Sequence, residues 1–183
     1  MNDQDLAQRL IGLRKAKGLS LDELAEKSGI SRATLSRIER SDTSPTAAAL
    51  GRLATSFGVS VADLFGFGAA AHDAKLEHTD QPVWRDPETG FQRRSVSPAI
   101  SGFRGSIIEG TLPAGTIISY AAPPLPDLEH HLVLLSGALT VTLGDTRHDL
   151  APGDCFRFRL NTPNAYHATG AEPARYLLTV ITP

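Results

Sequence analysis

Arginines and small residues recur at helical spacing in the segment SRATLSRIER, residues 31–40. At about 100° per residue, one arc of about 140° collects the side chains of Arg32, Ala33, Ser36, Arg37 and Arg40. Guanidinium groups bind guanine edges and phosphates, and small residues let a helix approach the bases closely. This face predicts binding in the major groove of double-stranded DNA, although the pattern alone also fits a solvated basic helix face.

The residues around this helix predict a helix-turn-helix. Ser20 and Glu23 have the spacing of a capping box, and Gly29 can end the helix that they begin. Ser31 then caps the arginine-bearing helix after only two residues, which is the short glycine-containing turn of such motifs. Two further helices with hydroxyl caps are expected at residues 46–57 and 60–65.

Residues 6–65 resemble the XRE, or lambda-repressor-like, helix-turn-helix family. The resemblance rests on the helix order, the turn glycine Gly29 and the stretch SRIER…SPT. It implies a five-helix bundle that binds operator DNA, with Ser31 to Arg40 as the recognition helix. It places Arg32, Ala33, Ser36 and Arg37 at base-reading positions, and Thr43, Ser44 and Thr46 near phosphate, where hydroxyls and helix N-terminal amides bind.

Three residues of this domain, Leu21, Arg14 and Glu39, are not expected to contact DNA. Leu21 stands where the family often has a glutamine that touches the DNA backbone, so that contact is not expected here. Arg14 and Glu39 resemble the family's buried ion pair between the first and third helices, so Glu39 is read as structural. Loss of one partner of such a pair costs roughly 3–5 kcal/mol at full burial.

The chain changes character after residue 66. Residues 67–81 are small, polar and aperiodic, and are read as a linker. Short β-rich runs follow, with clear examples at residues 105–112, 132–135, 139–143, 155–160 and 176–181. Hairpin turns are expected at 136–137, 144–145 and 152–154. The pattern predicts a helix-turn-helix domain over 1–66 and an all-β sandwich or barrel over 82–183.

The β segment LEHHLVLLSGALTVTLGDTRHDLAPGDCFRFRLNTPNAYHATG is similar to the cupin core, and the similarity spans roughly residues 103–181. It implies a jelly-roll β-barrel, so the expected fold is multidomain, α then β. Residues 82–98 resemble the lead-in strand of combined XRE–cupin regulators, in which Trp84 is expected to anchor packing.

The metal ligands of catalytic cupins are replaced in this chain. Those enzymes hold a divalent metal with two histidines and a glutamate from one motif and a histidine from a second. Here the glutamate position, seven residues before Gly137, is His130, and the second-motif histidine is Asn164. The expected upstream histidine pair falls in residues 120–126, which contain no histidine. We therefore expect no metal, no cofactor and no catalytic residues.

A barrel without metal still offers a pocket. If the glutamate position faces inward, period-two alternation points His130 into the barrel and His131 out of it, and places Asn164 and Tyr166 inside. The inward residues, together with one tyrosine upstream, are expected to line a small-molecule site: Tyr120, His130, Asn164 and Tyr166. The alternative is that they satisfy one another in a closed interior.

Composition sets the remaining bounds. The net charge is −2, but the first 66 residues carry nine Lys and Arg against eight Asp and Glu, while the rest carry nine against twelve. DNA binding must therefore depend on a local surface. The single cysteine, Cys155, rules out an internal disulfide and is read as a buried strand residue. The sequence has no signal-peptide pattern and no membrane-length apolar run, which favours the cytoplasm.

These observations predict a homodimeric transcription factor that binds double-stranded operator DNA at half-sites about 34 Å apart. An effector of unknown identity in the barrel would shift the arrangement of the two DNA-binding heads. Two alternatives stay open. One is a metal-dependent cupin enzyme with an accessory DNA-binding domain, and the other is a regulator whose barrel serves only for dimerisation.

Overall fold

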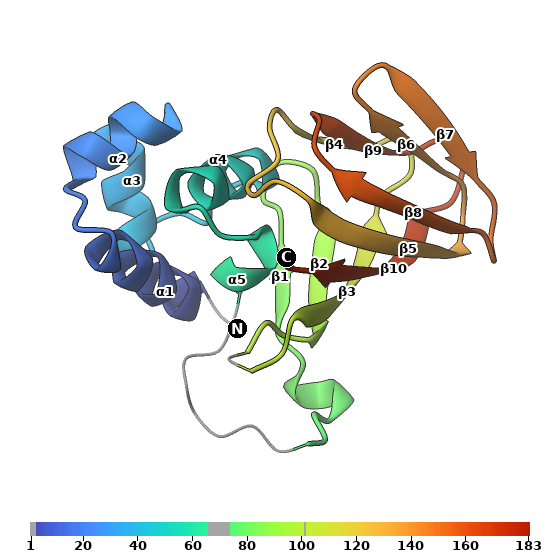
Figure 1. Cartoon of the computed structure of the whole chain (residues 1–183), viewed down its shortest axis with the longest axis horizontal. Helices are drawn as coiled ribbons and strands as arrows, with labels where there is room; N and C mark the ends of the chain where they lie inside the picture. The colour runs from blue at the N-terminus through green and yellow to red at the C-terminus, as the bar shows by residue number, and fades with distance from the viewer. Residues whose placement is uncertain (1–2, 66–73, 101) are drawn as a thin grey trace.

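The computed structural model describes residues 3–65, 74–100 and 102–183. The chain forms a helical domain followed by a β domain (Figure 1). The helices are α1 (Asp3–Ala16), α2 (Leu21–Ser28), α3 (Arg32–Glu39), α4 (Ala47–Phe57) and α5 (Val61–Leu64). Helices α4 and α5 lie between the other helices and the sheets, so they form the side of the helical domain that meets the barrel.

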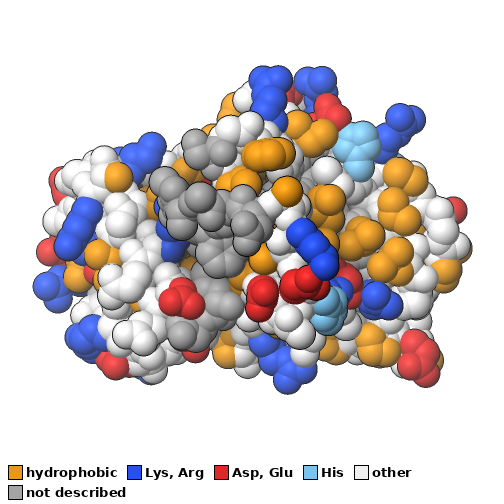
Figure 2. Space-filling view, turned by 90° about the horizontal axis from the view of Figure 1, so that it is seen from below, with side chains coloured by type: hydrophobic (Ala, Val, Ile, Leu, Met, Phe, Trp, Pro, Cys, Tyr) orange, Lys and Arg blue, Asp and Glu red, His pale blue; other side chains and the backbone are white. Residues whose placement is uncertain are grey.

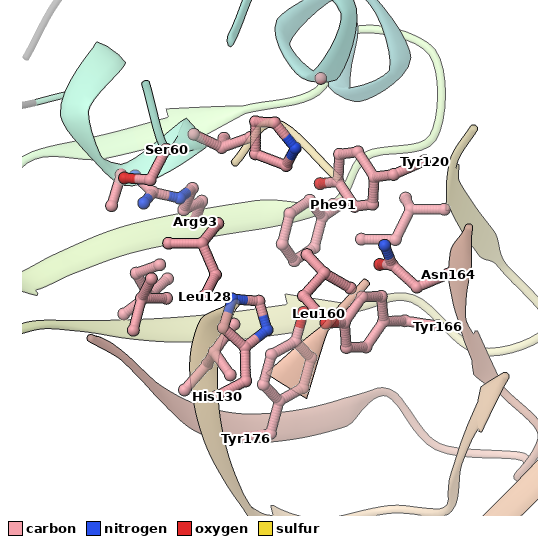
Figure 3. A pocket seen from close by; sticks show the side chains of 18 of the residues that line it. Ser60, Phe91, Arg93, Tyr120, Leu128, His130, Leu160, Asn164, Tyr166 and Tyr176 are labelled. Carbon is pink, nitrogen blue, oxygen red and sulfur yellow. The ribbon is translucent and has the colours of Figure 1, made fainter. Parts of the chain in front are cut away.

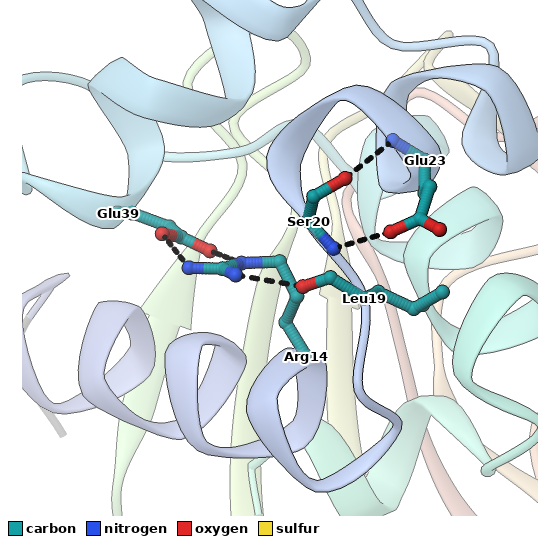
Figure 4. Close-up of polar contacts among 5 residues, drawn as sticks. All are labelled: Arg14, Leu19, Ser20, Glu23 and Glu39. Carbon is teal, nitrogen blue, oxygen red and sulfur yellow. Dashed lines mark hydrogen bonds and ion pairs between the residues drawn. The ribbon is translucent and has the colours of Figure 1, made fainter.

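The helices begin and end where the sequence predicts. The hydroxyl of Ser20 accepts a hydrogen bond from the backbone N–H of Glu23, and the Glu23 carboxylate accepts one from the N–H of Ser20 (Figure 4). Gly29 ends α2 in the left-handed region, at φ 64°. Ser31 then caps α3 by accepting from the N–H of Thr34, at 3.1 Å. The predicted helix-turn-helix is confirmed.

The expected ion pair between α1 and α3 is present (Figure 4). Arg14 Nε donates to Glu39 Oε1 at 2.6 Å, and Nη2 donates to Oε2 at 2.9 Å. The same guanidinium donates to the carbonyl of Leu19 at 2.8 Å. Both charged side chains are about 15% exposed. Glu39 is thus held inside the domain and is not available to DNA.

The β domain consists of two antiparallel sheets, consistent with the expected jelly roll. The larger sheet has the order β1-β2-β3-β10-β5-β8, and the smaller one β4-β9-β6-β7. The strands are β1 (Val83–Arg85), β2 (Gln92–Ser97), β3 (Gly105–Leu112), β4 (Ile117–Tyr120), β5 (Leu128–Ser136), β6 (Leu139–Leu143), β7 (Thr146–Leu150), β8 (Cys155–Leu160), β9 (Asn164–Ala168) and β10 (Ala174–Ile181).

Two of the three predicted hairpin turns were wrong. Gly144 does join the paired strands β6 and β7. The turn at Gly137, however, leads from β5 in the larger sheet to β6 in the smaller one, and residues 152–154 lead from β7 back to β8. Gly137 has φ 79°, and a Cβ there would lie 2.5 Å from the carbonyl oxygen of Pro173. Glycine is needed where the chain crosses between sheets, as it is in a hairpin.

The segment between the domains lies partly outside the described residues, which omit 66–73 and therefore residues 67–73 of the predicted linker. Its later part contains the short 3-10 helix η1 (His78–Asp80). The expected lead-in strand is a pair of strands, because β1 and β2 pair with each other and β2 also pairs with β3. Among the residues that are described, no helix is long and apolar enough to span a membrane.

Cys155 departs from its prediction. It was expected to be buried, but its side chain is exposed. It lies on the outer face of β8, opposite Val133 on β5, and β8 is the edge strand of the larger sheet. Alternation along β8 instead turns Phe156 and Phe158 inward.

Aromatic side chains join the two domains. Trp84 on β1 is buried, with its ring centroid 5.7 Å from that of Phe65 after α5 and 6.4 Å from that of Phe91. Its indole N–H donates to the hydroxyl of Ser44, which precedes α4, at 3.2 Å. The prediction that Trp84 anchors packing is confirmed, and one continuous core includes residues of both domains.

Candidate DNA-binding face and barrel cavity

The predicted recognition helix presents its basic face to solvent. Leu35 and Ile38 bury their side chains in the helical core, at 2% and 3% exposure. The opposite side carries the predicted DNA-binding residues, of which Ser36 is half-buried and the others are exposed: Ser31, Arg32, Ala33, Ser36, Arg37 and Arg40. The fold therefore brings these residues together on one accessible surface.

The three arginines of this face differ in their partners. Arg32 Nε lies 3.1 Å from Asp22 Oδ1 on α2. Arg40 donates to the carboxylate of Asp42 at 2.8 Å and to the hydroxyl of Ser36 at 2.9 Å. Within the described part of the chain, the side chain of Arg37 has no hydrogen bond or ion pair. Exposed ion pairs contribute roughly 0.2–1 kcal/mol, so DNA phosphate can replace them. Arg37 has no such contact to give up.

The three predicted phosphate contacts lie beside this face, and all are half-buried: Thr43, Ser44 and Thr46. Thr46 caps α4 by accepting from the N–H of Ala49 at 3.2 Å. Ser44 accepts from Trp84. A hydroxyl that accepts one hydrogen bond still has its own hydrogen to donate. Both residues thus keep a donor for phosphate while serving the fold.

A cavity of about 70 Å³ lies inside the barrel, under the helical domain (Figure 3). One water needs roughly 10–15 Å³ of such space, so the cavity has room for about five to seven water-sized groups. All four residues predicted to line a pocket do line it: Tyr120, His130, Asn164 and Tyr166. Alternation holds as expected, because His130 is buried and His131 pairs with Glu129 on the outer face.

The roof of the cavity belongs to the helical domain, which the sequence did not indicate. Residues of α4 and α5 line it: Gly51, Ser60, Val61 and Ala62. Gly51 lies against the ring of Tyr120, and a Cβ at that position would be 2.7 Å from Tyr120 Cδ1. This close approach requires a residue without a side chain at position 51. The lining of the cavity is therefore complete only when the two domains are packed together.

Three tyrosines form one wall. Tyr166 stacks on Tyr176, with ring centroids 6.0 Å apart and an interplanar angle of 10°, and meets Tyr120 edge-on at 6.5 Å. Burial raises the pKa of all three phenols, so the hydroxyls stay protonated. Tyr176 was missed at the sequence level. It fits because β3 has a glycine, Gly110, opposite its ring.

Two polar groups of the cavity lack hydrogen-bond partners. His130 Nδ1 and Asn164 Nδ2 are buried, and no described residue bonds to either. The His130 ring packs edge-on against Phe158 at 5.0 Å. Burial lowers the pKa of His130 to about 4, with a smaller effect from His131 in the same direction. His130 is therefore a neutral imidazole at neutral pH.

Arg93 on β2 brings a charge into the same cavity. It is 5% exposed, and its guanidinium carbon lies 4.2 Å from the centroid of the Phe65 ring. Its one hydrogen bond to the described residues goes to the Ser95 hydroxyl, at 3.3 Å. Burial lowers the pKa of Arg93 to about 10. Sequence reasoning missed this residue, although alternation along QRRS requires one arginine to face inward; the other, Arg94, pairs with Glu109 on β3.

The cavity does not fit the metal that catalytic cupins hold. His130 and Asn164 occupy two of the four ligand positions, and tyrosines and apolar side chains occupy much of the rest of the lining. The described residues contain no group of three or more His, Cys, Asp or Glu side chains that could hold a metal. The described lining offers one imidazole and one amide oxygen but no carboxylate or thiol, and a protonated phenol is a poor metal ligand. A nearby guanidinium also opposes a cation.

Comparisons with known proteins agree with both resemblances. A helix-turn-helix family model matches residues 10–64, and a cupin domain model matches residues 126–180. The HTH-type transcriptional regulator SutR of Escherichia coli is 27% identical over 177 residues, which cover 93% of this chain and 91% of that protein. The crystal structure of an HTH_3 family transcriptional regulator from Vibrio cholerae is similar, with a TM-score of 0.78, 27% identity and coverage of 99% and 97%.

An enzyme shares the fold at lower similarity. Hydroxypropylphosphonic acid epoxidase of S. wedmorenis has a TM-score of 0.50 and 17% identity, with 98% of each chain covered. A likeness at this level of identity extends to the fold alone.

Proposed function

We propose, from the premise that this chain is a helix-turn-helix transcriptional regulator with a C-terminal cupin domain, that a small effector bound in the barrel cavity controls its binding to operator DNA. The observation that carries this proposal is the shared cavity. Its floor and walls belong to the barrel and its roof to α4 and α5 of the DNA-binding domain. A ligand in the cavity therefore contacts both domains. We propose that the DNA-binding domain comprises residues 1–66 and the cupin domain residues 82–183.

The proposed DNA contacts divide by position. Arg32, Ala33, Ser36 and Arg37 would face bases in the major groove, and Ser31 and Arg40 would flank them at the ends of the recognition helix. Thr43, Ser44 and Thr46 would donate to phosphate beside it. Their location at the start of α4 matters, because the same helix carries Gly51 of the cavity roof.

This arrangement gives the effector a short path to DNA. A ligand that favours one packing of α4 against Tyr120 also favours one position of the loop at Ser44, which is held by Trp84. A ligand changes operator affinity only if it binds the two domain arrangements unequally. A cavity built from both domains meets that condition, since moving the roof changes the contacts that the ligand makes.

We also propose a cytoplasmic homodimer, because two recognition helices on adjacent half-sites bind operator more tightly than one. Hydrophobic side chains gather on the barrel half of the surface in Figure 2. On the outer face of the larger sheet, five apolar residues alternate with the buried ones: Ile107, Val133, Leu135, Leu177 and Ile181. This face is the proposed interface between the barrels.

The alternatives make different demands. A cupin enzyme needs metal or another catalytic constellation, so elemental analysis of the purified protein should find near-stoichiometric metal if that alternative holds. We propose that the chain is not an enzyme, on the support of the replaced ligands. A barrel that serves only for dimerisation needs no cavity, and the unpartnered polar atoms of His130 and Asn164 favour the sensing role.

The proposal is tested by selecting bound duplexes from a randomised DNA pool with the full-length protein. We expect enrichment of an inverted repeat whose half-sites are about one helical turn apart, ~34 Å. Calorimetry against a broad metabolite panel then identifies ligands, and operator affinity is measured with and without each. No enriched sequence would refute DNA-specific binding. A bound ligand without effect on operator affinity would refute sensing.

A further inference from the structure

The charge of Arg93 is not neutralised within the described structure. Among the described residues, no carboxylate lies within ion-pair distance of its guanidinium, which donates to the Ser95 hydroxyl and stacks on the face of Phe65. Asp63 is the one carboxylate whose field acts on Arg93. That carboxylate is already engaged, because its Oδ2 accepts from the backbone N–H and the hydroxyl of Ser60 at 2.8 and 2.7 Å.

A buried cation without a counter-charge is unfavourable for a fold. Removing a charge from water costs several kcal/mol unless a partner compensates it, and buried arginines are therefore nearly always paired. The guanidinium has five N–H donors, of which one is used by Ser95. Its planar fork matches a carboxylate, which can accept two parallel hydrogen bonds. An anion with this geometry would compensate the charge of Arg93.

The other residues of the cavity limit which further groups the anionic ligand can have. Figure 3 places Asn164 on the side of the cavity away from Arg93, with Tyr120 above Asn164 and with His130, Tyr166 and Tyr176 lower in the view. Asn164 Nδ2 is a donor without a partner, so it calls for an acceptor oxygen on the ligand. The remaining walls are apolar, including Ile108, Ile118 and Leu128. A second charge on the ligand would have no counterpart there.

We propose that the cavity binds a small organic acid whose single carboxylate pairs with Arg93 and whose far end presents an uncharged oxygen to Asn164. The size of the cavity suits a molecule of about five to seven non-hydrogen atoms. The inference rests on the proposed sensing function. The proposal also gives Phe65 a role. The ligand carboxylate would bind the guanidinium of Arg93, which stacks on Phe65 directly after α5. The ligand would therefore act at the boundary between the two domains.

The test compares acids with their uncharged amides on the full-length protein. The probes are lactate, pyruvate and 4-hydroxybutyrate, with acetate and propionate as acids that lack the second oxygen. Each acid is paired with the corresponding amide, and binding is measured by calorimetry and by thermal shift. We expect at least one acid to bind saturably and its amide to bind at least tenfold more weakly. This comparison uses the wild-type protein and does not depend on how a variant folds.

Variants then assign the effect to the residue. Arg93→Gln removes the charge and should weaken the binding of the acid at least tenfold, while Arg93→Lys should retain part of it. Arg147→Gln is the matched control, because Arg147 is exposed on β7 of the smaller sheet, away from the cavity, and its loss should leave binding unchanged. Far-ultraviolet circular dichroism of each variant verifies that it is folded.

Two results would overturn the inference: no acid of the panel binds at millimolar concentration, or acid and amide bind alike. These outcomes are distinct from a failure of sensing. If a neutral compound binds and changes operator affinity, sensing stands and the assignment of Arg93 falls. If an acid binds through Arg93 and leaves operator affinity unchanged, the ligand class stands and sensing falls.

Discussion

The indole N–H of Trp84 donates a hydrogen bond to the hydroxyl of Ser44, at 3.2 Å. This contact ties the first strand of the barrel to the loop before α4, where phosphate contacts are expected. It crosses from one domain to the other over 40 residues of sequence. The barrel thus touches the DNA-binding domain both at the cavity roof and at the edge of the proposed DNA surface.

A double-mutant cycle tests this link. Trp84→Phe keeps an aromatic ring against Phe65 but removes the donor, and Ser44→Ala removes the acceptor. Each should lower the free energy of unfolding by about 1 kcal/mol, as is typical for a net hydrogen bond. In chemical denaturation, the double variant should lose less than the sum of the two. Additive losses would show that the two side chains are not coupled.

The close approach of Gly51 to Tyr120 gives a prediction with a matched control. A methyl group at Gly51 would press on the Tyr120 ring, so Gly51→Ala should destabilise the protein by about 1–3 kcal/mol, as overpacking does. Gly12, in α1, has nothing within 4 Å of the added Cβ. Gly12→Ala should therefore stabilise the protein by about 1 kcal/mol, because alanine is the better helix former.

Thermal unfolding of the two variants measures the difference. Opposite shifts in melting temperature would support tight packing of the two domains at this point. If Gly51→Ala stabilised the protein as Gly12→Ala does, α4 would not be packed against Tyr120.

Burial of His130 predicts a pH dependence of stability. The pKa of His130 is lowered to about 4 in the fold, whereas an exposed histidine has a pKa of about 6.5. Between these values the unfolded chain binds a proton that the folded chain does not, so the free energy of unfolding decreases as the pH falls. The decrease should reach about 3 kcal/mol by pH 4, and it begins above the range in which carboxylates titrate.

Denaturation at several pH values between 7 and 4.5 measures this effect, with the pH range set by the two pKa values. His130→Gln should flatten the profile in this window, because glutamine does not titrate. His131→Gln, one residue away on the outer face, should leave the slope in place. An unchanged slope in His130→Gln would assign the pH dependence to other groups.

Removing one charge of the Arg14–Glu39 pair should lower the free energy of unfolding more than replacing both charges. Glu39→Gln leaves Arg14 partly buried without its counter-charge and should cost about 2–4 kcal/mol, somewhat less than at full burial. The double change Arg14→Met with Glu39→Leu removes both charges and should recover much of this loss. Urea denaturation compares the two variants. A double variant that is as unstable as Glu39→Gln, or less stable, would contradict the expectation.

Local signals accounted for most of the elements. The caps at Ser20 and Ser31 and the glycine at position 29 placed α2 and α3, because each acts within one turn of helix. The predicted strands 105–112, 139–143 and 155–160 coincide with β3, β6 and β8. Local signals did not indicate which strands belong to the same sheet. A turn with Ser136-Gly137 looks alike whether the two strands pair or separate into different sheets.

Some of the cavity residues could be predicted from the sequence and others could not. Tyr120, His130, Asn164 and Tyr166 follow from strand alternation and from the position of a known motif, and all four meet in one cavity. Arg93 belongs to the segment read as a lead-in strand, where alternation turns it inward. Gly51 belongs to a helix and reaches the cavity only because the domains pack together. Residues brought to a site by packing between domains leave no spacing pattern in the sequence.

The most direct test of the central claim is the affinity of wild type and Arg37→Ala for the selected operator and for a scrambled duplex of the same length. Fluorescence anisotropy at fixed salt gives the four dissociation constants, and Arg147→Ala, on β7 of the smaller sheet, serves as the control. We predict that Arg37→Ala weakens operator binding by roughly 1–3 kcal/mol and changes binding to the scrambled duplex far less. Equal loss on both duplexes would make Arg37 a phosphate contact, and unchanged operator affinity would contradict the assignment of α3 as the DNA-reading helix.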